Sequence, residues 1–184
     1  MEMKLGNLNI LPASGQLDLL APSTAVMIAS LSDSDQIGVT EIDPTLSDTA
    51  AFCEKYQIAP EVTANCVIIE ATRGERKQMA ACLILATTRA DVNGIVRRTL
   101  DARKASFAPM EEAVRQSGME YGAINPIGLP SDWPILIDSR IVTLEQVVIG
   151  SGVRKSKIIL PGKILATLPN AQVLEGLGQA RPAI

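Results

Sequence analysis

The most informative segment of the sequence is Gly118-Met119-Glu120-Tyr121-Gly122-Ala123-Ile124-Asn125-Pro126-Ile127-Gly128-Leu129-Pro130. Its three glycines and two prolines stand among apolar residues, whereas a flexible linker would be polar and low in complexity. Glycines in this setting indicate fixed backbone angles and a close approach of the backbone to a ligand. A tight turn between a helix and a strand is the simpler interpretation. A second glycine cluster, Gly150-Ser151-Gly152, favours the shaped loop.

The composition predicts one globular domain. The chain has 184 residues, of which 47% are hydrophobic and 20% are charged, and this is enough for one domain with its own core. Residues 1–15 show no clear periodicity, so we expect them to form a flexible N-terminal arm and residues 16–184 to form the domain. Only 3% of the residues are aromatic, so aliphatic side chains must fill the core, and aromatic platforms for base stacking are not expected.

Charge and rare residue types exclude several classes of protein. The net charge of -3 argues against a DNA-binding or other non-specific nucleic-acid-binding protein. The odd number of cysteines, Cys53, Cys66 and Cys82, indicates a reducing compartment rather than a disulfide framework or a zinc site. Histidine is absent from the sequence, so we expect neither a metal nor a cofactor. No apolar run has the length of a membrane span, and we expect a cytoplasmic protein.

Periodicity and capping residues predict strands and helices in irregular order. Ser47 is the expected cap of the second helix, and Asp91 that of the third. Hairpins rather than a sustained alternation of strand and helix indicate an α+β fold with a mixed sheet or a partial barrel, and no dinucleotide-binding or phosphate-loop fingerprint is present. We expect helices at residues 22–31, 47–59, 91–100, 109–117 and 164–168, and strands at residues 39–42, 63–70, 79–86, 104–107, 134–138, 146–149 and 157–160.

Three segments together resemble one known family. They are Gly122-Ala123-Ile124-Asn125-Pro126-Ile127-Gly128, then Ile135-Leu136-Ile137-Asp138, then Val148-Ile149-Gly150-Ser151-Gly152-Val153-Arg154-Lys155. In order and spacing they are similar to the YbaK-type aminoacyl-tRNA deacylases, the freestanding relatives of the editing domain of bacterial prolyl-tRNA synthetases. The likeness covers roughly Val39 to Leu174, and its most specific part is the Gly-x-x-x-Pro-x-Gly loop.

The resemblance implies a barrel-like mixed sheet with flanking helices. It also implies hydrolysis of the ester bond between a mischarged amino acid and the 3′ end of a tRNA, with aminoacyl-tRNA, and in some cases a synthetase, as partner. In such relatives the loop forms a wall of the aminoacyl pocket, and its backbone amides can stabilise a developing oxyanion. The substrate-binding residues that the resemblance implies here are Gly122, Ala123, Ile124, Pro126, Gly128, Gly150, Ser151 and Gly152.

One position departs from the family pattern. The family carries a functional lysine on the strand that enters the central hairpin, and the matching residue here is Asn65. An amide can hydrogen-bond a ribose hydroxyl or a phosphate, but it has no charge and cannot act as an acid or base near neutral pH. Three options follow: a deacylase that works mainly by positioning substrate and water, a pocket in which Arg97, Lys104 or Arg154 compensates, or a protein that binds without hydrolysing.

Further candidates come from charge and position. Asp138 ends an apolar strand next to the glycine loop, where a carboxylate could hold the α-ammonium of the substrate or orient water, or simply cap a turn. Two basic clusters are candidates for tRNA phosphate contacts, with a solvated surface as the alternative. Their members are Arg97, Arg98 and Lys104 in the first, and Arg154 and Lys155, followed by Lys157, in the second.

The sequence thus favours a metal-free hydrolase of misacylated tRNA that removes a small amino acid, on a proline tRNA or a similar one. Asn65 and Asp138 are its predicted catalytic residues. A non-catalytic module that binds tRNA or a synthetase is the main alternative. Hydrolysis of a small ester unrelated to tRNA is a third.

Overall fold

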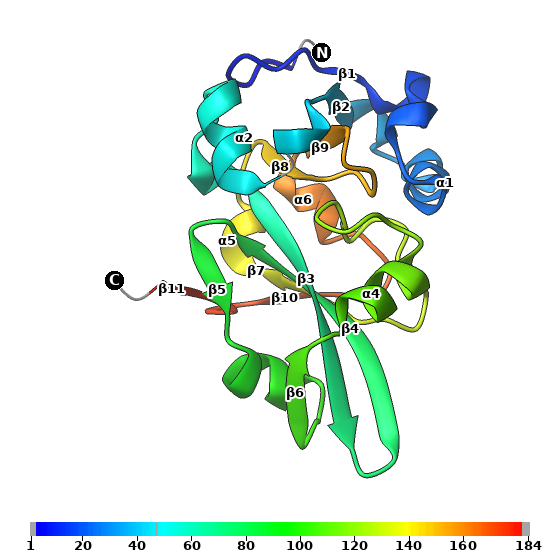
Figure 1. Cartoon of the computed structure of the whole chain (residues 1–184), viewed down its shortest axis with the longest axis vertical. Helices are drawn as coiled ribbons and strands as arrows, with labels where there is room; N and C mark the ends of the chain where they lie inside the picture. The colour runs from blue at the N-terminus through cyan, green and yellow to red at the C-terminus, as the bar shows by residue number, and fades with distance from the viewer. Residues whose placement is uncertain (1–2, 47, 182–184) are drawn as a thin grey trace.

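A computed structural model describes residues 3–46 and 48–181, in which short strands and helices surround one long β-hairpin (Figure 1). The strands are β1 (Leu11–Pro12), β2 (Gly38–Glu41), β3 (Ala64–Arg73), β4 (Arg76–Leu85), β5 (Thr88–Ala90), β6 (Lys104–Phe107), β7 (Ile135–Asp138), β8 (Val147–Gly150), β9 (Ser156–Leu160), β10 (Ala171–Leu174) and β11 (Gly178–Ala180). The helices are α1 (Pro22–Ser30), α2 (Thr49–Tyr56), α3 (Arg97–Thr99), α4 (Met110–Ser117), α5 (Ser139–Val142) and α6 (Gly162–Leu165), with a π-helical turn η6 (Val92–Val96) before α3.

The hairpin of β3 and β4 is the centre of a five-stranded sheet with the order β10-β7-β4-β3-β6. Its register runs from Ala64 opposite Leu85 to Arg73 opposite Arg76, and Gly74 takes the positive φ of 59° that the turn requires. β7 lies parallel to β4, while β6 is antiparallel to β3. β4 is buried along most of its length, as its apolar run from Met79 to Leu85 predicts.

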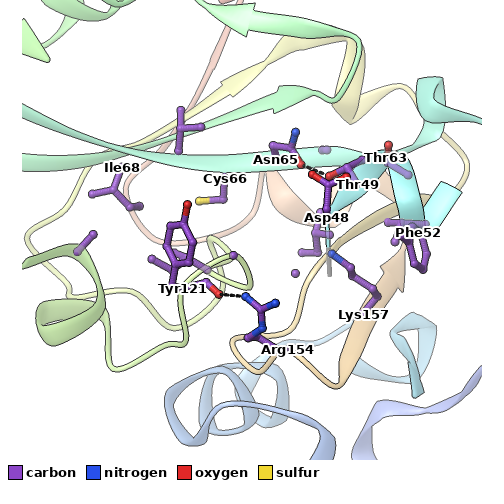
Figure 2. A pocket seen from close by; sticks show the side chains of 18 of the residues that line it. Asp48, Thr49, Phe52, Thr63, Asn65, Cys66, Ile68, Tyr121, Arg154 and Lys157 are labelled. Atoms are coloured by element: carbon purple, nitrogen blue, oxygen red, sulfur yellow. Dashed lines mark hydrogen bonds between the residues drawn. The ribbon is translucent and has the colours of Figure 1, made fainter. Parts of the chain in front are cut away.

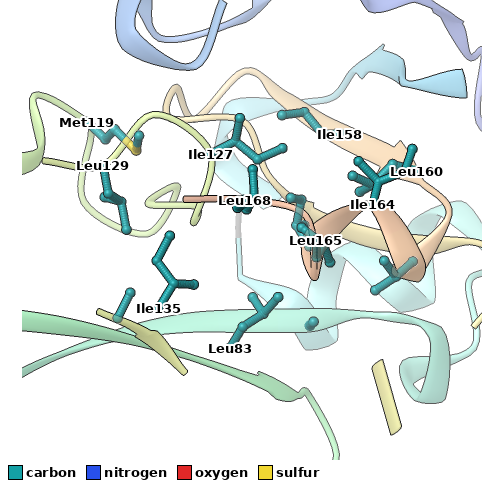
Figure 3. Close-up of a cluster of buried hydrophobic side chains, with 14 of the residues drawn as sticks. Leu83, Met119, Ile127, Leu129, Ile135, Ile158, Leu160, Ile164, Leu165 and Leu168 are labelled. Atoms are coloured by element: carbon teal, nitrogen blue, oxygen red, sulfur yellow. The ribbon is translucent and has the colours of Figure 1, made fainter. Parts of the chain in front are cut away.

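A four-stranded sheet with the order β1-β2-β9-β8 packs across the entry to the hairpin. An isolated parallel bridge between Thr63 and Val148 joins the two sheets. Apolar side chains from β9, α6 and the loop before β7 fill the space between them and meet Leu83 and Ile135 of the larger sheet (Figure 3). The predicted α+β class is confirmed. The four- and five-stranded sheets do not close into a barrel, because among residues 3–46 and 48–181 one isolated bridge rather than a ladder connects them.

The glycine loop, residues 122–128, is held from two sides. On one side the hydroxyl of Thr24 in α1 donates to the carbonyl of Ile127 at 2.9 Å and accepts from the side-chain amide of Asn125 at 3.1 Å. On the other side the N–H of Gly152 donates to the carbonyl of Ala123 at 2.8 Å. These contacts fix the loop between α1 and the β8–β9 turn, so it is a shaped element and not a linker.

The N-terminal segment differs from the sequence expectation. Residues 3–15, expected to be a flexible arm, instead pair with β2 through β1. They also pack Leu5, Leu8 and Ile10 against the cluster around Phe52. The segment has a partner because β2 is otherwise an edge strand, and this partner lies too far along the chain for local periodicity to reveal it.

The start of α2 differs by one residue from the predicted one. The expected cap Ser47 lies outside the described residues. The N-cap of α2 is Asp48, whose carboxylate accepts from the backbone N–H groups of the first turn.

Gly150 supplies a stability test of this arrangement. A Cβ on residue 150 would overlap the carbonyl of Ala123, so Gly150→Ala must push the glycine loop away from β8. We expect a loss of about 1–3 kcal/mol in the free energy of unfolding, measured by urea denaturation. Gly15→Ala is the control, because no atom lies within 4 Å of its Cβ position and the loss should stay within about 0.5 kcal/mol. Equal stability of the two variants would contradict the packing described here.

Candidate functional site

A pocket of about 720 Å³ opens where the two sheets meet, above the first half of β3 (Figure 2). β3 forms one wall, and β8 with the glycine loop forms the facing wall. α2 and the residues from β6 to α4 close the sides. The lining residues are Thr45, Asp48, Thr49, Phe52, Thr63, Ala64, Asn65, Cys66, Val67, Ile68, Phe107, Ala108, Met110, Ala113, Tyr121, Gly122, Ile124, Val148, Ile149, Gly150, Arg154 and Lys157.

The two ends of the pocket differ in chemistry. Cys66, Ile68 and Tyr121 lie at one end of the view in Figure 2, while Asp48, Thr49 and Lys157 lie at the other. Arg154 reaches the pocket between the two groups. An apolar group and a charged group of one ligand can therefore be bound side by side.

The glycine loop contributes Gly122 and Ile124 to the lining. Ala123, Pro126 and Gly128 are not among the described lining residues. The carbonyl of Ala123 accepts from Gly152, and Gly128, with a φ of 87°, packs so closely on the backbone of Ser23 that a Cβ would overlap it. Gly122 and Ile124 thus face the pocket, while Ala123 and Gly128 hold the loop in place.

The second glycine cluster divides in the same way. Gly150 lines the pocket, but Ser151 and Gly152 lie behind it. The Ser151 hydroxyl is buried, 2.7 Å from the hydroxyl of Ser156, and it donates to the carbonyl of Val153 at 2.9 Å. These bonds fix the turn between β8 and β9, so the structure gives Ser151 and Gly152 a supporting position without direct access to a ligand in the pocket.

Asn65 lies in the pocket wall, half-buried on β3. Its side-chain carbonyl accepts a hydrogen bond from the hydroxyl of Thr49 at 2.8 Å (Figure 2). This bond ties β3 to the first turn of α2 and orients the amide. Sequence reasoning missed Thr49, since nothing in its local pattern shows that α2 packs on β3.

Asp138, the other predicted catalytic residue, is placed elsewhere. Its carboxylate is fully buried and accepts from Arg140 Nε at 2.8 Å, from Arg140 Nη2 at 2.9 Å and from the backbone N–H of Gly178 at 2.7 Å. Burial raises the pKa of this carboxyl group, but the bonds from Arg140 and Gly178 outweigh it and leave the pKa below its ordinary value. Asp138 does not line the pocket, and its position corrects the expected contact with substrate: it joins β7 to β11.

The basic residues separate into two groups. Arg154 lines the pocket, where its guanidinium donates to the carbonyls of Tyr121 and Pro44, each at 3.3 Å. Lys155 is exposed and borders a different hollow near Tyr56. The first basic cluster lies outside the pocket on α3 and β6, so of the three residues proposed to compensate at Asn65 only Arg154 is in place. That cluster consists of Arg97, Arg98 and Lys104.

The pocket does contain a lysine, presented from the opposite sheet. Lys157 on β9 is only 8% exposed, and its ammonium nitrogen lies 5.4 Å from the centre of the Phe52 ring. Burial lowers the pKa of Lys157, and nearby Arg154 lowers it further, while Cys53 and Asp48 act in the opposite direction. One sequence signal could have identified Lys157 as a pocket residue: it is a lysine inside the apolar run that forms β9. The basic residues just before it, Arg154 and Lys155, favour its interpretation as a member of an exposed cluster instead.

The pocket cysteine is a poor nucleophile. Desolvation raises the pKa of the Cys66 thiol, and it raises that of neighbouring Cys82 to about 12. Both thiols therefore stay protonated near neutral pH, which agrees with a packing role.

The described part of the chain lacks two further kinds of feature. Within residues 3–46 and 48–181, His, Cys, Asp and Glu form no group of three or more that is arranged to hold a metal ion. The same residues contain no helix of the length and apolarity needed to cross a membrane.

Residues 43–168 match the family described as the aminoacyl-tRNA editing domain. The match spans every described residue that lines the pocket, together with the glycine loop. The chain belongs to the aminoacyl-tRNA editing domain family. This confirms the resemblance drawn from the glycine loop. No curated protein matches the chain.

Solved structures share the editing-domain fold at low sequence identity. A candidate trans-editing enzyme for prolyl-tRNA synthetase is 18% identical, with a TM-score of 0.71 over 88% of this chain and 99% of the other. A hypothetical protein is 17% identical, with a TM-score of 0.67 over 77% and 90% of the two chains. A candidate signal transduction protein from Marinobacter aquaeolei is 19% identical, with a TM-score of 0.52 over 90% of this chain but 30% of the other.

Asp138→Asn separates a structural role from a catalytic one. Losing the charge should lower the free energy of unfolding at pH 7 by about 2–3 kcal/mol, because the amide keeps only one acceptor oxygen, turns an NH2 group toward a donor from Arg140 or Gly178, and no longer pairs with the guanidinium. Since the folded-state pKa is depressed, this contribution is present above the pKa of the unfolded state and disappears as the pH falls through the folded-state pKa. Urea denaturation across the acidic range up to neutral pH measures it.

The control for Asp138→Asn is Asp132→Asn, at an exposed carboxylate. It should change the free energy of unfolding by no more than about 0.5 kcal/mol. A folded Asp138→Asn protein of full stability that has lost activity on substrate would return Asp138 to the catalytic residues.

Proposed function

We propose that the chain is a trans-acting aminoacyl-tRNA deacylase, which hydrolyses the ester of a small amino acid wrongly attached to a tRNA. The observation that carries the proposal is the pocket between the sheets. It lies wholly inside the segment that matches the editing-domain family, and it joins an apolar end to a charged end. The 3′ end of an aminoacyl-tRNA has the same two parts, an amino-acid side chain and a polar ribose-phosphate.

The apolar end suits a small side chain. Cys66, Ile68 and Ala113 form its surface on one side, and Ile124 from the glycine loop narrows it from the other. A rigid wall of this kind discriminates mainly by excluding larger groups, because an extra methylene that fits gains only about 1–3 kcal/mol. The fixed loop therefore sets an upper limit on the size of the amino acid.

The polar groups can hold the rest of the aminoacyl end. Asp48 is the carboxylate among the described lining residues, so it takes the position for the substrate α-ammonium that the sequence had suggested for Asp138. Asn65 and its partner Thr49 lie where they can hydrogen-bond the ribose hydroxyls. The backbone of Gly122 can approach the ester closely because it carries no side chain.

The reaction needs few groups. A water oxygen adds to the ester carbonyl carbon, the bond from that carbon to the ribose oxygen breaks, and the ribose oxygen leaves with a proton. Exclusion of bulk water and orientation of the ester supply much of the catalysis in such a site. Backbone N–H groups of the glycine loop are candidates for stabilising the developing oxyanion.

A non-catalytic binding module is the second candidate. It is supported by the neutral amide at position 65 and by the Marinobacter protein, in which the shared fold makes up 30% of a longer chain described in terms of signal transduction. On this alternative the same pocket binds an aminoacyl end or a related ligand without turnover. The two candidates differ in whether product forms.

Hydrolysis of a panel of aminoacyl-tRNAs, including alanyl-, seryl- and cysteinyl-tRNA-Pro, tests the proposal. We expect release from one or two small amino acids, at the same rate with EDTA, and at least a tenfold lower kcat/KM for Asp48→Asn and Asn65→Ala. Thr45→Val at the pocket edge is a control for general disturbance of this region and should change kcat/KM less. Absence of release from every member, with tRNA binding intact, would favour the binding module.

The first basic cluster is tested by salt dependence. Arg97, Arg98 and Lys104 lie outside the pocket, so their proposed contacts are with phosphates of the tRNA body. Arg98→Ala with Lys104→Ala should reduce the slope of log affinity against log salt by roughly 0.7–0.9 for each phosphate that the variant no longer neutralises, the lower value applying to single strands. Filter binding over a series of salt concentrations measures the slope.

The control pair for this experiment is Arg89→Ala with Lys163→Ala. Both residues are exposed and lie on other elements, β5 and α6, so the pair removes the same charge from elsewhere on the surface. The slope should then stay close to that of the unaltered protein. If the cluster variant shows the same slope as the control pair, the cluster is an ordinary solvated surface.

A further inference from the structure

Lys157 occupies an unusual position for a lysine. It lies in β9, a strand that pairs with β2 on one side and with β8 on the other. Lys157 is opposite Thr40 of β2 and opposite Gly150 of β8. Its neighbours Ser156 and Ile158 are buried, and only 8% of Lys157 itself is exposed. The backbone that carries the side chain is therefore fixed by two ladders, and the side chain is directed into the pocket (Figure 2).

This position is costly for a cation. Removing an ammonium from water disfavours its charged form, and lysine is rarely this buried in proteins. Asp48 and Cys53 favour the charged form, but burial is the largest effect, and the guanidinium of Arg154, which lines the same pocket, disfavours the charge further. A buried cation beside a second cation is stabilised when an anion enters between them, so the arrangement favours an anionic ligand.

Hydrogen bonds also orient Arg154 in the pocket, where it can contact the same anionic ligand. Its backbone N–H donates to the carboxylate of Glu120 at 2.5 Å, which fixes the turn. Its guanidinium contacts the neutral carbonyl oxygens of Tyr121 and Pro44 rather than a carboxylate. These contacts orient the group without neutralising its charge.

The chemistry of the substrate then identifies the anion. In an aminoacyl-tRNA the carboxyl group of the amino acid is esterified, and its amino group is a cation whose partner in this pocket is the carboxylate of Asp48 and not the two basic side chains. The anions nearest the ester are the phosphates of the terminal nucleotides. A phosphate is also the anion that an ammonium and a planar guanidinium bind well together.

We propose that Lys157 and Arg154 form a phosphate subsite that binds the 5′-phosphate of the terminal nucleotide and thereby positions the ester beside the glycine loop. The proposal rests on the proposed deacylase function. It assigns substrate binding to two residues on the β8–β9 side of the pocket, opposite β3. Lys157 is a binding residue in this account, and the proton transfers of hydrolysis do not pass through it.

Calorimetric titration with adenosine 5′-monophosphate and with adenosine tests the subsite directly, without turnover. Lys157→Met should weaken binding of the monophosphate by about ten- to a hundredfold, the value of a charge-assisted contact, and leave binding of adenosine nearly unchanged. Lys163→Met, which removes an exposed lysine on α6, is the matched control and should alter neither affinity. A Lys157→Met protein that is folded and binds the monophosphate as tightly as the wild type would overturn the proposal.

Moving the charge across the pocket provides the second test. Asn65 lines the pocket from β3, so a lysine there presents its ammonium to the same cavity from the other wall. Asn65→Lys combined with Lys157→Met should recover a substantial part of the monophosphate affinity that the single variant lacks. The opposite result is no recovery of affinity in the double variant and no binding of the monophosphate by Lys157→Arg. It would mean that Lys157 acts through folding and would overturn the subsite. The melting temperatures of the variants would then fall together with the affinity.

These outcomes separate the subsite from the enzyme activity. Lys157-dependent binding of the monophosphate without hydrolysis of any aminoacyl-tRNA would retain the subsite and reject the deacylase. Hydrolysis that is unaffected by Lys157→Met, in KM as well as kcat, would retain the deacylase and reject the subsite.

Discussion

The close packing of the glycine loop on β8 is the contact on which the site depends. The carbonyl of Ala123 lies where a side chain of residue 150 would otherwise be, and it accepts a hydrogen bond from Gly152. Because both partners are backbone groups, the wall they form cannot relax by changing a rotamer. The pocket exists because this wall stands opposite β3 while a single bridge, from Thr63 to Val148, joins the two sheets behind it.

The two cationic side chains described in the pocket come from one of its two facing walls. β3 supplies the neutral Asn65, and the β8–β9 side supplies Arg154 and Lys157. A lysine on β3 and a lysine on β9 can serve the same cavity, because what a phosphate requires is a cation at the right distance and not one particular strand. The absence of lysine at position 65 therefore does not by itself remove a cation from the site. Positions that face one another across a pocket have to be considered together.

Local sequence signals predicted those parts of the fold that local forces specify. The strand at residues 104–107 and the α4 helix ending before Gly118 followed from alternation and from a helix stop at glycine, and the long hairpin followed from two apolar runs around a charged turn. β10 and β11 were missed, because each is short and largely exposed and depends on a partner distant in the chain. The helix expected from Asp91 begins as a π-helical turn, which the spacing of apolar residues does not reveal. The site was likewise predictable where a motif marks it, as at Gly122 and Gly150. Asp138 was predicted to belong to the site only because it follows the glycine loop in the sequence. Its actual partner, the backbone N–H of Gly178, depends on β11, which the sequence did not predict.

The most direct measurement is a crystal structure with a non-hydrolysable analogue, 3′-alanylamino-3′-deoxyadenosine 5′-phosphate, in which an amide replaces the ester. We expect the alanyl group to lie between Ile68 and Ile124 and the phosphate to lie within hydrogen-bonding distance of Lys157 or Arg154. An analogue bound in this pocket with its phosphate directed to solvent, or bound at another surface, would contradict this expectation.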